Sequence, residues 1–297
     1  MTTKHPALAW TLFVILSIIW GSSFILIKKG LTALGPEEVA TLRIASASLV
    51  LLPFAMNRIK QINKKNITSL ILVGFMGSLL PALFFALAQT KLPSALTGIM
   101  NALTPFFTII ISVIFFNVKP DLRVYFGVML GFLGTLFLIS TRENGQLSFN
   151  YYAFFVVVAT VLYGINANLI KHYLGDLKAL SIASLSLVMV GPLAVIYLLL
   201  LTPFLVHIHE PQVLMASGYI VILGVLGTAL ALILFNKMVQ LTNAVFSTSV
   251  TYLIPIISVF WGFIDGEKLS LLQLASMLVI MLGIFISNSK KVIKKPG

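Results

Sequence analysis

The hydrophobic and polar positions divide the chain into ten apolar runs of about 20 residues, separated by short segments that carry most of the charges. The runs cover residues 7–27, 39–57, 67–90, 92–117, 122–141, 150–170, 179–203, 212–236, 243–264 and 269–289. A helix needs about 20 apolar residues to cross a bilayer, and these runs are continuous rather than alternating as in barrel strands. The pattern therefore predicts an all-α integral membrane protein with ten transmembrane helices and no separate soluble domain.

The chain also resembles itself at matching places in this pattern. One pair of similar segments, at an offset of 143, is Trp20-Gly21 followed by Leu26-Ile27-Lys28 and Tyr163-Gly164 followed by Leu169-Ile170-Lys171. A second pair, at an offset of 150, is Leu103-Thr104-Pro105 and Leu253-Ile254-Pro255. A weaker match joins Gly134 to Gly283. The chain is therefore predicted to consist of two five-helix halves, residues 1–142 and 143–297.

Five is an odd number, so the second half is expected to cross the membrane in the inverse orientation of the first. Inverted repeats are typical of secondary transporters, where they surround a binding site near the bilayer midplane. This arrangement indicates alternating access, in which one side of the site opens at a time. A duplicated chain that transports nothing remains the alternative.

Composition agrees with a membrane protein and changes the meaning of the net charge. Hydrophobic residues make up 59% of the chain and charged residues only 9%, whereas about a quarter of a soluble domain is charged. The net charge of +12 lies between the apolar runs, which favours membrane orientation over nucleic-acid binding. Placing both termini in the cytoplasm puts most of the 20 Lys and Arg residues on that side. The first run is also too long for the apolar core of a cleaved signal peptide.

Polar and aromatic residues within the repeated runs are the candidates for a solute pathway, because such groups need partners in lipid. These candidates are Trp20, Ser22, Ser23, Asn101, Tyr163, Asn166, Asn168, Thr251 and Tyr252. Asn166 and Asn168 are two residues apart and cannot both face one direction on a helix. For each of these residues, contact between helices is the alternative to contact with solute. Pro105 and Pro255 are expected to kink their helices at equivalent positions and to act in gating.

Arg43 is the charge that lies well inside an apolar run. Five residues separate it from Glu38, which is roughly 7–8 Å along a helix, so an ion pair with an acid at the outer surface is the favoured interpretation. Binding of a substrate carboxylate is the alternative. Lys28 and Lys171 are expected to anchor the ends of their helices at the membrane surface.

Several functions lack their characteristic residues. The chain contains no cysteine, and no nucleotide-binding, metalloprotease or nucleophile-elbow motif is present, so no catalytic residue, metal or cofactor is predicted. His207 and His209 are too few for a structural zinc site. The interiors of the predicted helices contain no acidic residue, which argues against a buried carboxylate proton relay. A channel, or a membrane scaffold or sensor, is the alternative to a carrier.

The chain resembles the EamA branch of the drug/metabolite transporter superfamily. The residues that carry the resemblance are Trp20-Gly21-Ser22-Ser23-Phe24, Lys28, Gly35-Pro36, Arg43, Pro105, Pro255 and Gly266-Glu267-Lys268-Leu269. The family often repeats the Gly-Glu motif in the first half, but this chain has Phe116-Asn117-Val118-Lys119 there. The resemblance implies a ten-helix inner-membrane permease for a small metabolite, amino acid or drug, often an exporter. It specifies neither the substrate nor the oligomeric state.

Overall fold

The computed structural model describes residues 6–118, 122–139 and 150–288, and all regular elements in these ranges are helical. The elements are α1 (Pro6–Gly21), α2 (Ser23–Gly30), α3 (Pro36–Met56), η1 (Ile59–Gln61), α4 (Ile67–Gly74), η2 (Phe75–Leu79), α5 (Leu80–Gln89), α6 (Ser94–Met100), η3 (Asn101–Leu103), α7 (Thr104–Phe116), α8 (Leu122–Ile139), α9 (Tyr152–Tyr173), α10 (Ala179–Leu200), α11 (Phe204–His207), α12 (Pro211–Ile222), η4 (Leu223–Leu230), α13 (Ala231–Leu241), α14 (Ala244–Thr248), η5 (Ser249–Tyr252), α15 (Ile254–Ile264) and α16 (Leu271–Asn288). Of these, η2 and η4 are π-helical, and η1, η3 and η5 are 3₁₀-helical.

Eight helical stretches of the described chain are long and apolar enough to cross a membrane. They are Ala7–Gly30, Pro36–Met56, Ile67–Gln89, Ser94–Phe116, Tyr152–Tyr173, Ala179–Leu200, Pro211–Leu241 and Ala244–Ile264. Each of them overlaps one of the apolar runs, which confirms the all-helical membrane class. The other two runs contain shorter apolar helical segments, Tyr125–Gly134 in α8 and Leu271–Gly283 in α16.

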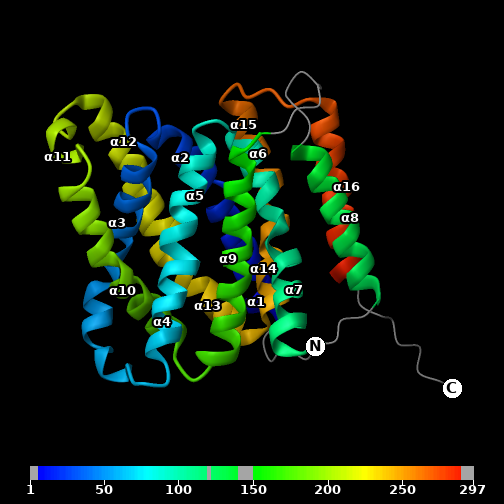
Figure 1. Ribbon diagram of the computed structural model, residues 1–297, viewed down its shortest axis with the longest axis horizontal. Coiled ribbons are helices and arrows are strands. Elements are labelled where there is room, and N and C mark those ends of the chain that lie inside the picture. The colour runs from blue at the N-terminus through cyan, green and yellow to red at the C-terminus, as the bar shows by residue number, and fades with distance from the viewer. Residues whose placement is uncertain (1–5, 119–121, 140–149, 289–297) are drawn as a thin grey trace.

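The spans lie side by side in one bundle, with α8 and α16 paired with each other at one lateral side of it (Figure 1). Glycines permit the closest approaches. A Cβ at Gly283 of α16 would lie 2.5 Å from the Gly131 nitrogen and from the Gly127 carbonyl oxygen of α8. The Gly-x-x-x-Gly pair of the fifth run is therefore a packing seam, as small residues often are between membrane helices.

In both halves, the glycine of the aromatic-glycine pair is a site of close contact between helices. A Cβ at Gly21 would lie 2.6 Å from Cβ of Ile257 in α15, and one at Gly164 would lie 2.9 Å from the Thr108 nitrogen in α7. Gly21 thus allows α1 to pack closely against α15, and Gly164 allows α9 to pack closely against α7. Large apolar side chains such as Phe126, Leu200 and Phe263 remain exposed at the bundle surface, as expected where lipid is the solvent.

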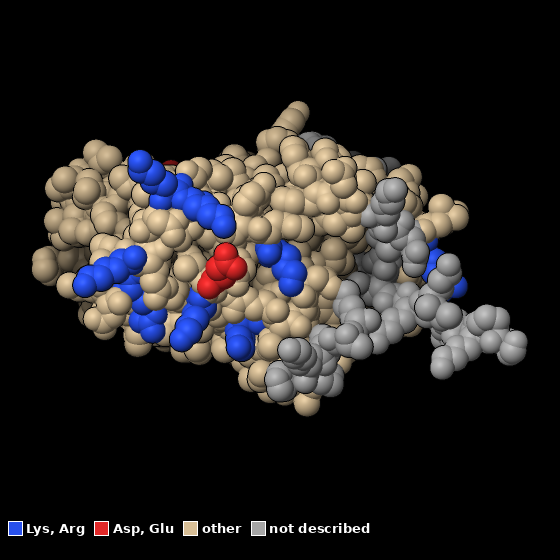
Figure 2. All heavy atoms as spheres, turned by 90° about the horizontal axis from the view of Figure 1, so that it is seen from below, with Lys and Arg blue, Asp and Glu red and all other residues tan. Residues whose placement is uncertain are grey.

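Charge is distributed unequally between the two ends of the bundle. Figure 2 shows the face that contains the α3–α4 and α9–α10 connections, where Lys and Arg atoms predominate over Asp and Glu atoms. Arg58, Lys60, Lys64 and Lys65 belong to the first of these connections. The acidic residues Asp265 and Glu267 lie at the opposite end, beyond α15.

Candidate functional site

A cavity lies among the helices of the bundle, with about 740 Å³ of space free of atoms, part of which is open to solvent. It is lined by Trp20, Ser23, Phe24, Ile27, Arg43, Gly77, Ser78, Phe85, Asn101, Thr104, Tyr163, Asn166, Gly227, Thr228, Leu232, Phe235, Thr248 and Thr251. These residues come from seven of the eight candidate spans; only Ala179–Leu200 contributes none. Both halves of the chain therefore build the cavity.

Many lining residues form pairs at the two sequence offsets of the repeat. At an offset of 150 the pairs are Gly77 and Gly227, Ser78 and Thr228, Phe85 and Phe235, and Asn101 and Thr251. At an offset of 143 they are Trp20 and Tyr163, and Ser23 and Asn166. Residues at equivalent places in the two sequences thus meet around one space.

Interruptions of the α-helical hydrogen bonding occur where helices border the cavity. The π-helical segments η2 and η4 contain Gly77 and Gly227, and such wide turns are frequent at functional sites. Trp20 bridges to one of them, because its Nε1 donates a hydrogen bond to the Gly227 carbonyl oxygen at 3.0 Å. Side chains and backbone together satisfy polar groups that a regular helix would pair internally.

The two prolines follow a second kind of interruption. The 3₁₀ segment η3 directly precedes α7, and η5 ends two residues before α15. Pro105 and Pro255 each occupy a position in the first turn of the helix that follows, where the missing N–H costs little. Each break therefore lies before its proline, and Asn101 and Thr251 of these breaks face the cavity.

Arg43 lies in the cavity wall and not at the bundle surface. Only 8% of the residue is exposed, its Nε donates a hydrogen bond to Thr228 Oγ1 at 2.8 Å, and Tyr163 lines the same cavity. The ion pair expected with an acid at the outer surface is not formed by any described residue. Glu38 instead accepts from the Gly35 backbone N–H at 2.8 Å and contacts His207 Nε2 at 2.9 Å.

The two asparagines of α9 have different surroundings, as their spacing predicted. Asn168 is buried between helices: its Nδ2 donates to the carbonyl oxygens of Thr108 and Gly164, and its Oδ1 accepts from Ser112 at 2.7 Å. Asn166 faces the cavity, and its buried Oδ1 has no hydrogen-bond partner in the described protein. Asn168 thus joins α9 to α7, whereas Asn166 has an acceptor available for another molecule.

Aromatic rings form much of the remaining cavity wall. Trp20 contacts Phe235 with ring centroids 5.3 Å apart, and Phe85 contacts Phe24 at 5.6 Å and Tyr163 at 5.8 Å. These separations are typical of favourable ring pairs. The predicted aromatic residues Trp20 and Tyr163 therefore belong to the wall.

Besides Asn168, two predicted pathway residues, Ser22 and Tyr252, are not among those that line the cavity. Ser22 accepts a hydrogen bond from Trp261 Nε1 at 2.9 Å and so links the first span to α15. Tyr252 belongs to η5. Ser23, one residue after Ser22, and Thr251, one residue before Tyr252, line the cavity instead.

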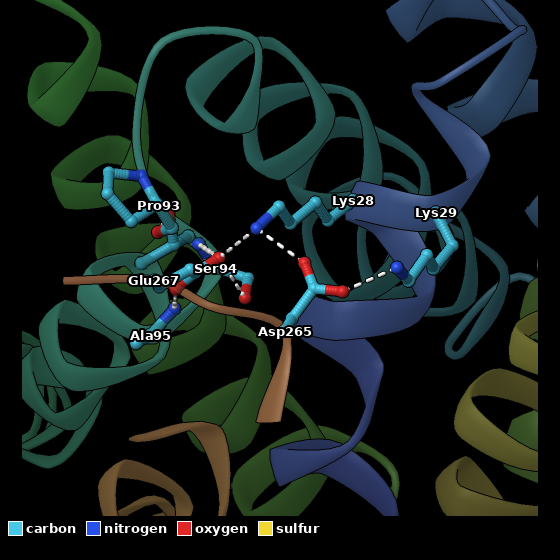
Figure 3. Close-up of polar contacts among 8 residues, drawn as sticks. Lys28, Lys29, Pro93, Ser94, Ala95, Asp265 and Glu267 are labelled. Atoms are coloured by element: carbon cyan, nitrogen blue, oxygen red, sulfur yellow. Dashed lines mark hydrogen bonds and ion pairs between the residues drawn. The ribbon is translucent and has the colours of Figure 1, made fainter. Parts of the chain in front are cut away.

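An ion cluster formed by Lys28, Lys29, Asp265 and Glu267 lies at the end of the bundle opposite the basic connections (Figure 3). Lys28 Nζ lies 2.6 Å from Asp265 Oδ2 and 2.7 Å from Glu267 Oε1, and Lys29 pairs with the other oxygen of Asp265. Lys28 was expected to be a surface anchor, but it joins the first span to the connection after α15. Sequence reasoning did not predict this cluster, although the Gly-Glu motif contains one of its acids.

Glu267 also caps the first turn of α6. Its Oε1 accepts from the backbone N–H and the hydroxyl of Ser94, at 2.9 and 2.7 Å, and its Oε2 accepts from the Ala95 N–H at 2.9 Å (Figure 3). These N–H groups have no partner within the helix, and a carboxylate there is favourable. One carboxylate thus connects α2, α6 and the connection after α15.

The carboxylates of the ion cluster are held in their charged forms. Hydrogen bonds from Lys28 and Lys29 lower the pKa of Asp265. Burial opposes ionisation of Glu267, but the hydrogen bonds from Lys28, Ala95 and Ser94 together bring its pKa below the ordinary value. Both acids are therefore ionised at neutral pH.

The corresponding junction at the other end is built differently. There Lys171 Nζ donates to the carbonyl oxygens of Val239 and Thr242, and α14 is capped by Asn243, whose Oδ1 accepts from the Phe246 N–H at 2.8 Å. Lys171 is thus also bound within the protein and is not a simple surface anchor. The first half lacks the Gly-Glu motif, and a local asparagine takes the place of a distant carboxylate.

A bundle of apolar spans around a cavity built from both halves of the chain defines a polytopic membrane transport protein. The sequence model of the EamA-like transporter family matches the chain twice, over residues 8–140 and 150–289. The chain belongs to this family.

Several relatives are similar to this chain in sequence over nearly its whole length, and one solved structure is similar to it in fold. An uncharacterized transporter of Archaeoglobus fulgidus is 25% identical over 95% of this chain and 99% of its own, and the uncharacterized inner membrane transporter YedA of Escherichia coli strain K12 is 22% identical over 91% and 87%. A probable terminal-alkyne amino-acid exporter of Streptantibioticus cattleyicolor is 21% identical over 97% and 95%. A crystal structure with 16% identity has the same fold, with a TM-score of 0.64 over 94% of this chain and 96% of that chain.

Proposed function

We propose that this transporter is a secondary carrier that moves one small organic solute at a time through the central cavity by alternating access. The observation that carries the proposal is the cavity wall, in which residues from equivalent places in the two halves form pairs around one site. Two inverted halves, residues 1–142 and 143–297, would make the routes to its two sides equivalent in design. α8 and α16 complete ten spans in this proposal.

The basic face in Figure 2 faces the cytoplasm in the proposed orientation, with both termini on that side of a cytoplasmic membrane. The ion cluster then lies on the outer side. Because Glu267 holds the first and fourth spans together, the cluster must separate before the cavity can open outward. At the proposed inner gate the described residues form hydrogen bonds without an acidic partner: Lys171 donates to the carbonyl oxygens of Val239 and Thr242, and Asn243 caps α14.

Export is the proposed direction. Its support is the similarity over nearly the full length to a protein whose name describes an amino-acid exporter. Solute would enter from the cytoplasm, where no ion pair joins the described residues of the gate, and binding would supply the free energy that separates the ion cluster on the other side.

Metabolite profiling of cells that express the chain tests this function. We expect one class of compound to rise in the medium and fall in the cytosol, relative to cells that lack the protein. In Gly77→Ala the added Cβ would lie 2.5–2.8 Å from the Asn166 amide, so this amide must move within the cavity wall and the variant should weaken the effect. Gly218→Ala is the matched control, because nothing lies within 4 Å of the added Cβ.

Two outcomes contradict the proposal. One is an unchanged distribution of every compound when the protein is present in the membrane. The other is an equal effect from wild type and Gly77→Ala, which would place the solute route away from the cavity. Uptake into purified vesicles then decides whether an observed compound crosses through this protein.

A further inference from the structure

We infer that the cavity binds organic acids that combine one carboxylate with an apolar, preferably aromatic, body, and that Arg43 holds the carboxylate. This inference rests on the proposed function, since it names the solute class of the same cavity. Three features carry it: a buried cation without an acid, an unused acceptor, and an aromatic wall.

The first feature is the Arg43 guanidinium. A guanidinium has five N–H donors in a planar fork that fits the two oxygens of a carboxylate. In the described structure its Nε–H donates to Thr228 and no carboxylate lies within ion-pairing distance, while the residue is only 8% exposed. A buried charge without a counter-charge is costly, and a solute carboxylate would supply that charge.

The neighbours of Arg43 hold it toward the cavity rather than neutralise it. Thr228 and Tyr163 contribute neutral hydroxyl groups, and both are themselves lining residues. Thr228 lies in the π-helical segment η4, and at the matching position of the first half Ser78 lies in η2. At the offset of 143, the residue of the second half that corresponds to Arg43 is Ser186. The second half therefore has no basic residue at the matching position.

The second feature is the amide of Asn166. Asn166 lines the same cavity, and its buried Oδ1, which lies next to Gly77, accepts no hydrogen bond from the described protein. An unsatisfied acceptor of this kind costs about 1–3 kcal/mol in general, which a ligand N–H or O–H would recover. A donor group near the carboxylate of the solute, such as an amino or hydroxyl group, would therefore add affinity.

The third feature is the apolar wall provided by Trp20, Phe24, Phe85 and Phe235. Such rings fit a flat or branched apolar body, and their faces offer no hydrogen-bond donors to the charged oxygens of a phosphate ester. No acidic residue lines the cavity among the described residues, which disfavours organic cations. Arg43 is also the single basic residue of the lining, so a polyanion would leave charge uncompensated.

A ligand series that varies charge on one phenyl body tests the inference with the full chain purified in detergent. The series consists of phenylalanine, phenyllactate, phenylpropionate and phenylethylamine, read by quenching of tryptophan fluorescence and by the shift in thermal unfolding temperature. We expect phenylalanine and phenyllactate to bind most tightly, phenylpropionate more weakly, and phenylethylamine at least about tenfold more weakly than phenylpropionate.

Variants then assign the charge recognition to Arg43. Arg43→Gln should lose the preference for the acids over phenylethylamine, and Arg43→Lys should keep part of it because the charge remains. Arg58→Gln makes the same chemical change outside the cavity, where Arg58 donates to the Phe54 carbonyl oxygen, and should bind like wild type.

Equal binding of phenylethylamine and phenylpropionate by the wild-type protein would overturn the inference, even if no variant could be purified. Equal preference in Arg43→Gln and wild type would overturn the role of Arg43. These measurements require no transport. Carboxylate binding without transport would contradict the proposed function alone, and transport of solutes without a carboxylate would contradict this inference alone.

Discussion

Glu267→Gln provides a direct test of the ion cluster as the outer gate. The substitution keeps the size of the side chain but removes the charge that Lys28 and the first turn of α6 share. A glutamine has one acceptor oxygen, and its amide N–H₂ would face the N–H groups of Ser94 or Ala95. Asp265 remains 2.6 Å from Lys28, so part of the cluster persists.

The expected magnitude follows from the contacts that are lost. Hydrogen bonds to a charged group contribute about 1.5–3 kcal/mol each, they are not additive, and loss of one partner of a buried pair costs about 2–5 kcal/mol. We therefore expect the closed outer side to lose about 2–4 kcal/mol, which corresponds to a roughly 30- to 1000-fold larger ratio of outward-open to closed protein.

Labelling of an introduced cysteine measures this ratio. The natural chain contains no cysteine, so Ser23→Cys gives a single reactive site in the cavity. A membrane-impermeant maleimide applied to intact cells should label Ser23→Cys much faster when Glu267→Gln is also present. Glu37→Gln, near the start of α3, is the control, because Glu37 forms no ion pair within the described structure. Equal labelling rates in the two double variants would refute the assignment of the gate.

Three further predictions concern other parts of the molecule. Because the pKa values of Asp265 and Glu267 are lowered, the cluster should be intact above about pH 4.3, the ordinary glutamate value, and should weaken only as pH falls through the lowered pKa values; the ratio of the labelling rates of Ser23→Cys with and without Glu267→Gln should therefore stay constant from pH 8 to pH 5, since the loss of thiolate slows both variants equally, and a fall of this ratio toward one within that window would contradict the pKa directions. Asn168→Ala should lower the free energy of unfolding by about 1–2 kcal/mol because it removes the links to Thr108 and Ser112, whereas Asn166→Ala should leave thermal stability unchanged and alter solute binding; equal loss of stability in both would show that the two amides have the same role. Pro105→Ala should slow transport more than it lowers protein abundance, because an N–H at this position favours a continuous helix across η3; transport rates equal to those of wild type would remove the proline break from the gating mechanism.

The membrane fold could be predicted because apolar run length determines whether a segment can span a bilayer. Trp20 and Tyr163, which the repeat marked as candidates, both line the cavity, and their contact with a solute stays a prediction. The rotation of a helix about its own axis cannot be predicted so simply from the sequence. For this reason Ser22 was predicted to line the pathway, and the sequence did not indicate which of Asn166 and Asn168 faces the cavity.

The remaining features depend on contacts distant in sequence. Arg43 was expected to meet an outer acid because Glu38 lies about one turn away, but Glu38 is occupied by the Gly35 N–H and His207. The bond from Glu267 to Ser94 spans 173 residues and has no local pattern. The π-helical segments were not predicted either, because no sequence motif marks them. The sequence did show that Gly77 and Gly227 are separated by 150 residues, the offset of the second pair of similar segments.

Each π-helical segment acts as a register shift within its membrane helix. The wider turns hold extra residues, so the helix that follows is rotated relative to an uninterrupted α-helix by about 100° for each added residue. After η4, this rotation determines that Phe235 faces the cavity, and after η2 the same holds for Phe85. Deletion of a single residue from either segment would therefore reassign the faces of half a span, turning lipid-facing residues inward while leaving its length and hydrophobicity almost unchanged.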